Sequence, residues 1–205
     1  MNPILFGILM VFCTNSFTFF LDFLLQKKFY NPITIEGIIL IFSFFVIFDY
    51  FSFFPTKFYE TEKIIQLSPV CKFLVSFDFF QYWMHRFEHL GKVNYHHFHH
   101  TFRIPSIKIA FTGHILDTLI LVLVPLYLCI ILFPMNMYSF ILTGSIISNY
   151  FLYIHNNYCF TFDKYLPSFG FMSAKQHEMH HRYCNCNFGH LFIWNDYLFC
   201  TLKSK

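Results

Sequence analysis

Histidine is the residue type that dominates the chemistry available to this sequence. Nine of the twelve histidines fall in two short windows. The first window contains HRFEH at 85–89 and HHFHH at 96–100, and the second contains HEMHH at 177–181. On a helix, residues three and four positions apart lie on one face, so each motif can direct two or three imidazoles at one point. Because neutral imidazole is a common ligand of iron, zinc, copper and nickel, these motifs predict metal binding.

The three motifs together predict a centre with more than one metal ion. Their predicted ligands are His85, His89, His96, His99, His100, His177, His180 and His181. Eight imidazoles are too many for one zinc ion and suit two octahedral metals. His97 lies off the ligand face of its motif and His190 lies outside any motif, so neither is expected to bind metal.

Two further histidines lie at the ends of apolar segments, level with His85. His155 heads the sequence HNN and is expected to be a direct ligand. His114, with Asp117 one turn further on, is expected either to bind metal or to contact the residues that bind it. The alternative is that His114 is a polar anchor at the level of the lipid headgroups.

Asp78 is the candidate catalytic residue. An acid within an apolar segment is costly and usually marks function. Asp78 and Gln81 share a helix face with His85, so the Asp78 carboxylate is expected to accept the second N–H of a ligating imidazole. A structural salt bridge or hydrogen bond is the alternative.

The composition indicates the kind of protein that must position these residues. Of 205 residues, 56% are hydrophobic and only 12% are charged, and the 33 phenylalanines exceed what one compact core could hide. Disorder, nucleic-acid binding and a disulfide-stapled secreted module are poor fits, since the net charge is only +3 and the seven cysteines are odd in number. The cysteines are expected to be free thiols, with Cys184 and Cys186 near the histidines as minor candidates for ligation. The sequence predicts a membrane protein.

Five apolar segments approach the length that crosses a bilayer. They are residues 4–25, 34–54, 70–84, 115–134 and 138–154. The first ends in two lysines rather than a cleavage site and is expected to be a retained span. The positive-inside rule then places the histidines on the cytosolic side. We expect an all-α integral membrane protein, with a bundle of four to five transmembrane helices and a cytosolic, histidine-rich helical cap. Residues 1–69 form the N-terminal transmembrane region and residues 70–205 the catalytic domain.

From Asp78 to Thr201 the sequence resembles the fatty acid hydroxylase/sterol desaturase superfamily of membrane di-iron enzymes. Residues 78–89 are similar to the family block D-x-x-x-Y-x-x-H-R-x-x-H, and residues 177–201 to its closing H-x-x-H-H, N-[YF]-G and W-D-x-L-F-G-T elements. Ile115 and Asp117 replace the usual Pro and Glu of an H-P-x-E element. Cys200 stands where Gly is common, and Asn195 separates the closing Trp and Asp.

The resemblance implies a reaction and its co-reactants. The expected reaction is the oxidation of an unactivated lipid C–H bond, giving an alcohol or a double bond, with two iron ions and O2 as co-substrate. Two electrons are expected from NAD(P)H through a separate donor, cytochrome b5 and its reductase, at the endoplasmic reticulum membrane. The expected substrate is a sterol or a fatty-acyl chain. Residues 180–188 resemble the sterol-oxidising branches of the family more than the branches that act on long-chain fatty acids. Glu88 and Glu178 are either proton relays or members of surface salt bridges.

Two other functions compete with this interpretation. Residues 177–181 also spell H-E-x-x-H, the zinc protease motif in which the glutamate activates water. That interpretation leaves the histidines of 85–100 without a role. A metal transporter or sensor is the non-enzymatic alternative, but its histidines should be distributed through the spans rather than gathered at one side.

Overall fold

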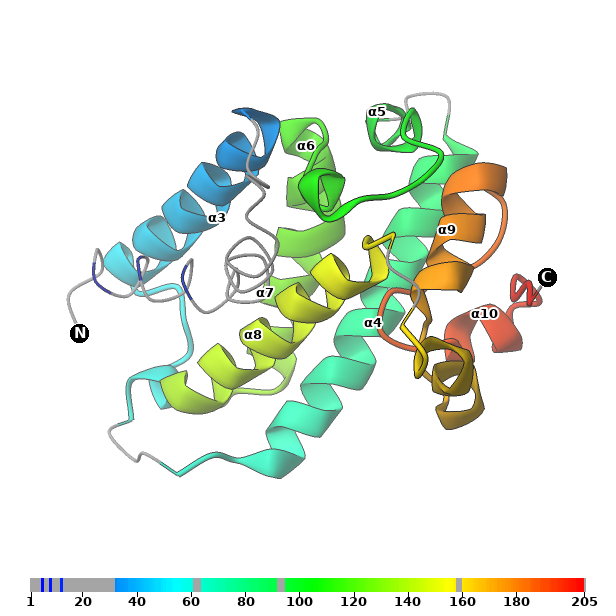
Figure 1. Cartoon of the computed structure of the whole chain (residues 1–205). Helices are drawn as coiled ribbons and strands as arrows, with labels where there is room; N and C mark the ends of the chain where they lie inside the picture. Colours follow the sequence, from blue (N-terminus) through cyan, green and yellow to red (C-terminus); the bar gives the residue numbers. More distant parts are fainter. Residues whose placement is uncertain are drawn as a thin grey trace.

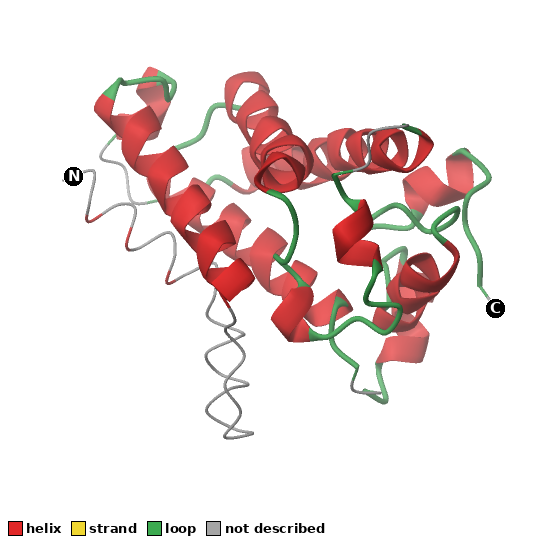
Figure 2. Ribbon diagram, turned by 90° about the horizontal axis from the view of Figure 1, so that it is seen from above, coloured by secondary structure: helices red, strands yellow, loops and turns green. Residues whose placement is uncertain are grey.

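The computed structural model of the chain describes residues 32–60, 64–91, 95–157 and 160–204, together with residues 5, 8 and 12. Within these ranges every regular element is a helix, and a single bridge between Phe171 and Phe192 is the β-type pairing (Figure 2). The predicted all-α class is therefore confirmed.

The helices follow one another with short connections. Their bounds are α3 Pro32–Tyr50, η1 Thr56–Tyr59, α4 Leu67–Leu90, α5 His97–His100, η2 Ile107–Ile109, α6 Ile115–Thr118, η3 Leu119–Leu123, α7 Val124–Leu132, α8 Met137–Ile154, η4 Asp163–Phe169, α9 Ala174–Tyr183 and α10 Trp194–Leu198. The segment η3 has π-helical geometry and joins α6 to α7 without a break, so the three form one helical rod.

The long helix α4 is the axis of the fold. It packs against α7 and α8 on one side, and α9 lies beside its C-terminal half (Figure 1). The amphipathic character of α4 explains this position, since its buried face changes along its length from phenylalanine to polar residues and histidine. The helix therefore carries the apolar core at its first half and presents His85 and His89 at its second.

Aromatic side chains fill the apolar half of the bundle. Phe140 on α8 is 1% exposed, and its ring contacts those of Phe45, Phe58 and Phe73 at centroid distances of 5.7, 5.5 and 6.1 Å. Each such ring buries a large apolar surface, and edge-to-face pairs are favourable beyond that burial. Part of the phenylalanine content therefore serves helix packing.

Fewer membrane spans are found than the five predicted. Among the described residues, two helical stretches, Ile115–Leu132 and Met137–Ile154, are long and apolar enough to cross a membrane. They match the fourth and fifth predicted segments. Segments 34–54 and 70–84 fall largely on α3 and α4, which are not among them, and α4 carries Asp78 within its length. Segment 4–25 lies outside the described residues apart from 5, 8 and 12, so four to five spans and a cytosolic cap are not confirmed.

The C-terminal region is built on α9, whose first turn is capped from both directions. The Ser173 side chain accepts from the backbone N–H of Gln176, and the Gln176 side chain accepts from the backbone N–H of Ser173. This capping box satisfies N–H groups that a helix start leaves without partners. It fixes where α9 begins, and with it the direction of the three histidines that follow.

Candidate metal centre

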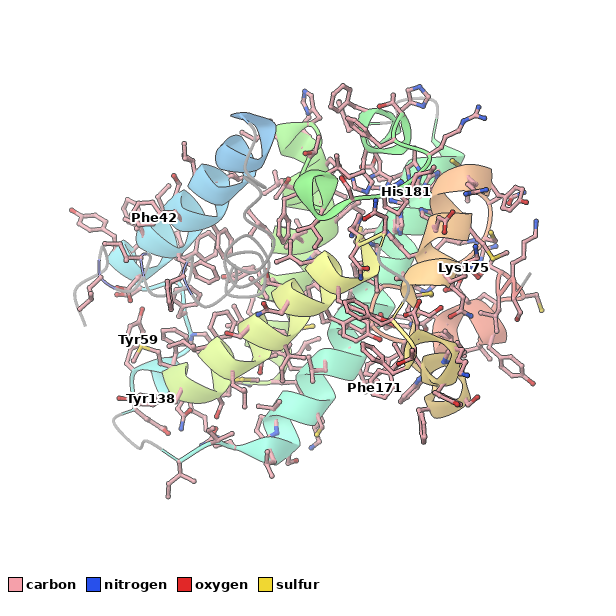
Figure 3. All side chains as sticks on the ribbon, viewed as in Figure 1. Phe42, Tyr59, Tyr138, Phe171, Lys175 and His181 are labelled. Carbon is pink, nitrogen blue, oxygen red and sulfur yellow. The ribbon has the colours of Figure 1, made fainter. Side chains whose placement is uncertain are left out.

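Nine of the ten histidines proposed from the sequence as ligands or possible ligands lie in two clusters. Cluster A contains His85, His89, His96, His100 and His180. Cluster B contains His99, His155, His177 and His181. Within each cluster the potential ligand nitrogens lie within 4.8 Å of one another. All nine side chains are buried except that of His89, which is half-buried. The nitrogen-rich region around the labelled His181 is visible in Figure 3, where α9 faces α4 and α5.

Helical spacing divides the histidines between the clusters. On α9, His177 and His181 are four residues apart and both enter cluster B, whereas His180 turns to cluster A. The segment around α5 does the same, since His96 and His100 enter cluster A. His99, between them, enters cluster B. The clusters are neighbours, because the rings of His100 and His181 lie 4.7 Å apart.

The outward ring nitrogens of five cluster histidines are held by backbone carbonyls. In each case Nδ1–H donates to a carbonyl oxygen, which fixes the tautomer and leaves the lone pair on Nε2. The Nδ1 to carbonyl distances are 2.8 Å from His85 to Phe188, 3.0 Å from His99 to Thr112, 2.7 Å from His155 to Phe151, 2.7 Å from His180 to Cys186 and 3.0 Å from His181 to Phe102.

The inward Nε2 atoms then face one another as lone pairs. The Nε2 atoms of His99 and His155 are 3.0 Å apart, although both Nδ1 atoms already donate to carbonyls. The Nε2 atoms of His177 and His155 are also 3.0 Å apart. Two nitrogens bound to one ion at about 2.1 Å and at right angles would lie about 3.0 Å apart. The donor set and its spacing therefore fit a shared cation in each cluster, because lone pairs at this distance repel unless a cation binds both.

A carboxylate orients one further candidate ligand, His96. The Nδ1 of His96 donates to the Asp117 carboxylate over 2.9 Å, and its Nε2 faces the Nε2 of His85 at 2.9 Å. Gly113 makes room for Asp117, since a Cβ at position 113 would meet its carboxylate oxygen at 2.3 Å. Asp117 thus makes the contact expected of Asp78.

Asp78 binds backbone rather than imidazole, which corrects the contact expected from the sequence. Its carboxylate is 1% exposed and accepts the backbone N–H groups of residues 190–192 over 3.3, 2.8 and 3.2 Å. The Asn195 side chain donates to its second oxygen over 3.0 Å. The hydrogen-bonding alternative weighed from the sequence describes it, and its structural effect is to fix the loop that follows α9.

A second carboxylate binds the same loop at the two residues that precede those bound by Asp78. Asp196 accepts the backbone N–H groups of Phe188 and Gly189, both over 2.8 Å. Because the Phe188 carbonyl orients His85, Asp196 acts on cluster A through the backbone. A Cβ on Gly189 would meet the Phe192 carbonyl oxygen at 2.4 Å, so the turn requires glycine.

His114, the tenth candidate, lies outside both clusters. Its side chain is exposed, its Nδ1 accepts the backbone N–H of Leu116 at the start of α6, and its ring stacks on Tyr95 at 5.0 Å. This is a helix-capping contact. His97 is exposed and belongs to neither cluster, as the sequence predicts for a non-ligand.

Two further buried polar residues lie at the centre, and of these the sequence predicts only Gln81, as a residue on the helix face of His85. His190 belongs to neither cluster but lies between them, with its ring 4.8 Å from that of His85 and 5.1 Å from that of His177. Gln81, one turn before His85 on α4, is 1% exposed. The spacing along α4 predicts the position of Gln81, whereas no motif includes His190, which lies on an irregular loop.

The two glutamates considered as proton relays have other partners. Glu178 belongs to neither cluster and pairs with Lys175 and Arg182, its partners one turn before and after on α9. Glu88 is 7% exposed and accepts the backbone N–H of His96 over 3.3 Å. Glu178 is thus a member of a surface ion-pair group, whereas Glu88 supports the backbone of a ligand segment.

Burial keeps the imidazoles neutral. It lowers the pKa of His99 to about 4. Burial, reinforced by neighbouring imidazoles, lowers the pKa values of His177 and His180 well below the ordinary value. Because a metal binds the neutral ring, these histidines need not lose a proton to bind at neutral pH.

Comparison with known proteins identifies the family to which the chain belongs. The fatty acid hydroxylase family matches residues 70–201. The chain therefore belongs to the fatty acid hydroxylase family, and the resemblance stated from the sequence is confirmed. A relative named "Alternative squalene epoxidase", from Phaeodactylum tricornutum (strain CCAP 1055/1), is 30% identical over 173 residues. The match covers 82% of this chain and 50% of the relative, so the chain spans about half the length of the curated relative it matches. No solved structure matches the chain.

Proposed function

We propose that this protein is a membrane-bound lipid oxygenase that uses two iron ions, one held by cluster A and one by cluster B. The observation that carries the proposal is the pairing of nine inward-facing imidazoles into two neighbouring clusters. Family membership supports iron and oxidation, and the two apolar helices support a membrane location. We place the catalytic residues in 70–205, at the cytosolic side of the endoplasmic reticulum membrane.

Iron, when bound, would supply the activation of O2, and the chain supplies position. The overall reaction joins one oxygen atom of O2 to the lipid and releases the other as water, so it consumes two electrons and two protons. We assign the electrons to NAD(P)H through a separate donor, cytochrome b5 and its reductase. Carbonyl and carboxylate partners hold the imidazoles of both clusters in place, which limits reorganisation during the reaction.

Two small adjoining cavities connect the apolar helix bundle to the clusters and support an apolar route of approach, although neither has the volume of a lipid chain. One, of about 40 Å³, is bordered by His96, His99 and His155. The other, also of about 40 Å³, lies between α3, α7 and α8 and is almost wholly apolar. Phe111, Val122 and Phe151 line both cavities. In our proposal an apolar chain approaches the metal ions from the helix bundle past these three side chains.

The relative's name favours a particular substrate class. We propose that the substrate is an unsaturated isoprenoid hydrocarbon such as squalene, and that the product is its epoxide. Epoxidation adds oxygen across a C=C bond, whereas the expectation from the sequence was attack on a C–H bond of a sterol or fatty-acyl chain. The support is the 30% identity, within an alignment that covers 82% of this chain, to the protein named "Alternative squalene epoxidase".

The metalloprotease alternative is less compatible with the geometry. In an H-E-x-x-H protease the glutamate activates the metal-bound water. Here Glu178 pairs with Lys175 and Arg182 on the outer side of α9, and cluster B has four imidazoles rather than two. A transporter is also disfavoured, because both clusters lie together where α4, α5, α8 and α9 meet.

The test is product formation in a host whose own squalene epoxidase is deleted. The chain is expressed under ¹⁸O2 and lipids are analysed by mass spectrometry. We expect epoxidised squalene carrying one ¹⁸O atom, lost in His180→Ala and retained in His97→Ala, an exposed histidine outside both clusters. A labelled sterol or fatty-acyl product would overturn the substrate but keep the oxygenase. Protein inserted in the membrane and containing iron, without any labelled lipid, would overturn the oxygenase.

A further inference from the structure

Gln81 and His190 are buried polar side chains that metal ligation leaves unexplained. Gln81 is 1% exposed and His190 is 5% exposed. Among the described residues, neither amide atom of Gln81 has a hydrogen-bond partner, and neither does Nδ1 of His190. Buried polar groups in folded proteins are nearly always paired, with protein or with ordered water. Three unpaired atoms therefore point to a ligand.

Both side chains line the same small cavity. It is the cavity of about 40 Å³ that borders His96, His99 and His155, so it touches ligands of cluster A and of cluster B. This volume holds a water molecule or another molecule of two or three heavy atoms, but no lipid chain. Gln81 offers a donor and an acceptor at one wall, and His190 adds a ring nitrogen.

The fold holds the two side chains firmly. Gln81 lies on α4, one turn before the cluster A ligand His85. His190 lies on the loop whose backbone N–H groups are bound by Asp78, and its ring packs on Phe151 at 4.6 Å. A preorganised donor and acceptor beside two cation sites are suited to a polar molecule that also reaches a metal ion.

We propose that Gln81 and His190 form a hydrogen-bonding site for a water-sized oxygen ligand between the two clusters. They act as positioning residues and do not bind metal. The proposed reaction releases one oxygen atom of O2 as water, and this cavity is where such a molecule would be held. The inference deepens the proposed function, since it needs metal in the clusters for its role in turnover.

The site is tested with azide, a small anion that competes for positions beside metal ions. Protein loaded with iron in lipid nanodiscs is titrated with sodium azide and followed by optical absorption. Gln81→Leu removes the amide while keeping an apolar side chain of similar size. We expect azide affinity to fall about tenfold, equivalent to about 1.4 kcal/mol, with iron content unchanged. The matched control is Leu121→Met on another wall of the cavity, which is expected to keep azide affinity within about twofold.

Unchanged azide affinity in Gln81→Leu would overturn the inference. Two iron ions per chain in the same variant would still support the proposed metal centre. A measurement that needs no iron separates the two further. In a crystal structure of the metal-free protein we expect a water bound to the Gln81 amide, missing in Gln81→Leu. A well-ordered Gln81 without such a water would overturn the inference, whatever the protein does with squalene.

Discussion

The Nδ1 atom of His96 donates to the carboxylate of Asp117, 2.9 Å away. Asp117 lies on α6, which begins at Ile115, whereas the histidine motif ends at His100. Both side chains are buried, with exposed fractions of 4% and 6%. A carboxylate bound to the outer nitrogen of a ligating imidazole raises the basicity of the inner nitrogen and fixes the ring. Asp117 is therefore expected to control metal affinity without touching the metal.

Replacing Asp117 tests this relationship. We expect Asp117→Ala to weaken iron binding to cluster A by about 10–100-fold, the usual cost of losing such a partner. Iron affinity is measured by competition with a chelator. Glu60→Ala, which removes an exposed carboxylate far along the chain from the centre, is the control. Equal affinities for the Asp117 variant and the unmodified protein would contradict the assigned role.

Asp78 is expected to act on stability. Asp78→Ala leaves the backbone N–H groups of residues 190–192 without their acceptor in a buried site. Each such loss is costly, so we expect the free energy of unfolding to fall by about 2–4 kcal/mol. Thermal unfolding in detergent measures the change, and Val75→Ala, an exposed position on the same helix, should show little of it. A melting temperature for Asp78→Ala as high as that of the control would refute the loop-anchoring role.

Gly189 is expected to tolerate no side chain. In Gly189→Ala the new methyl group would meet the Phe192 carbonyl oxygen at 2.4 Å, so the loop must shift. The shift would displace the Phe188 carbonyl that orients His85, and we expect both a lower melting temperature and loss of iron from cluster A. Gly91→Ala is the matched control, because Gly91 is exposed and has φ −76. If the two alanine variants behave alike, the close approach at Gly189 is not restrictive.

The wall shared by the two cavities is expected to control substrate access. Val122→Phe adds a ring where both cavities meet, so we expect product formation to fall about tenfold or more with iron content unchanged. Leu119→Phe, an exposed position on the same helical rod, is the control and should retain activity. Full activity in Val122→Phe would show that the substrate reaches the metal ions by another route.

The sequence motifs located the clusters because helical spacing is local. The i, i+3 and i, i+4 positions of 85–89, 96–100 and 177–181 are sufficient to predict which histidines converge, and His155 was indicated by its place after an apolar segment. The division of the nine histidines between two clusters was not predicted, since it depends on how α5 and α9 are rotated against α4.

The contact expected of Asp78 was wrong, and the positions of His114 and His190 were left open or missed, for a common reason. Helix periodicity shows that Asp78 shares a face with His85, but not that a loop from more than a hundred residues later occupies the carboxylate. His114 was considered as a ligand because of its level at a segment end, yet it caps α6 instead. His190 reaches the centre on an irregular loop, which has no periodicity from which to predict its direction.

The metal content of the purified protein tests the central claim most directly. Elemental analysis should find about two iron ions per chain, as expected for two histidine clusters of octahedral ligand sets. His180→Ala, in cluster A, and His177→Ala, in cluster B, should each retain about one iron ion, and His97→Ala should retain both. A single zinc ion per chain, or iron that is indifferent to both cluster variants, would contradict the account.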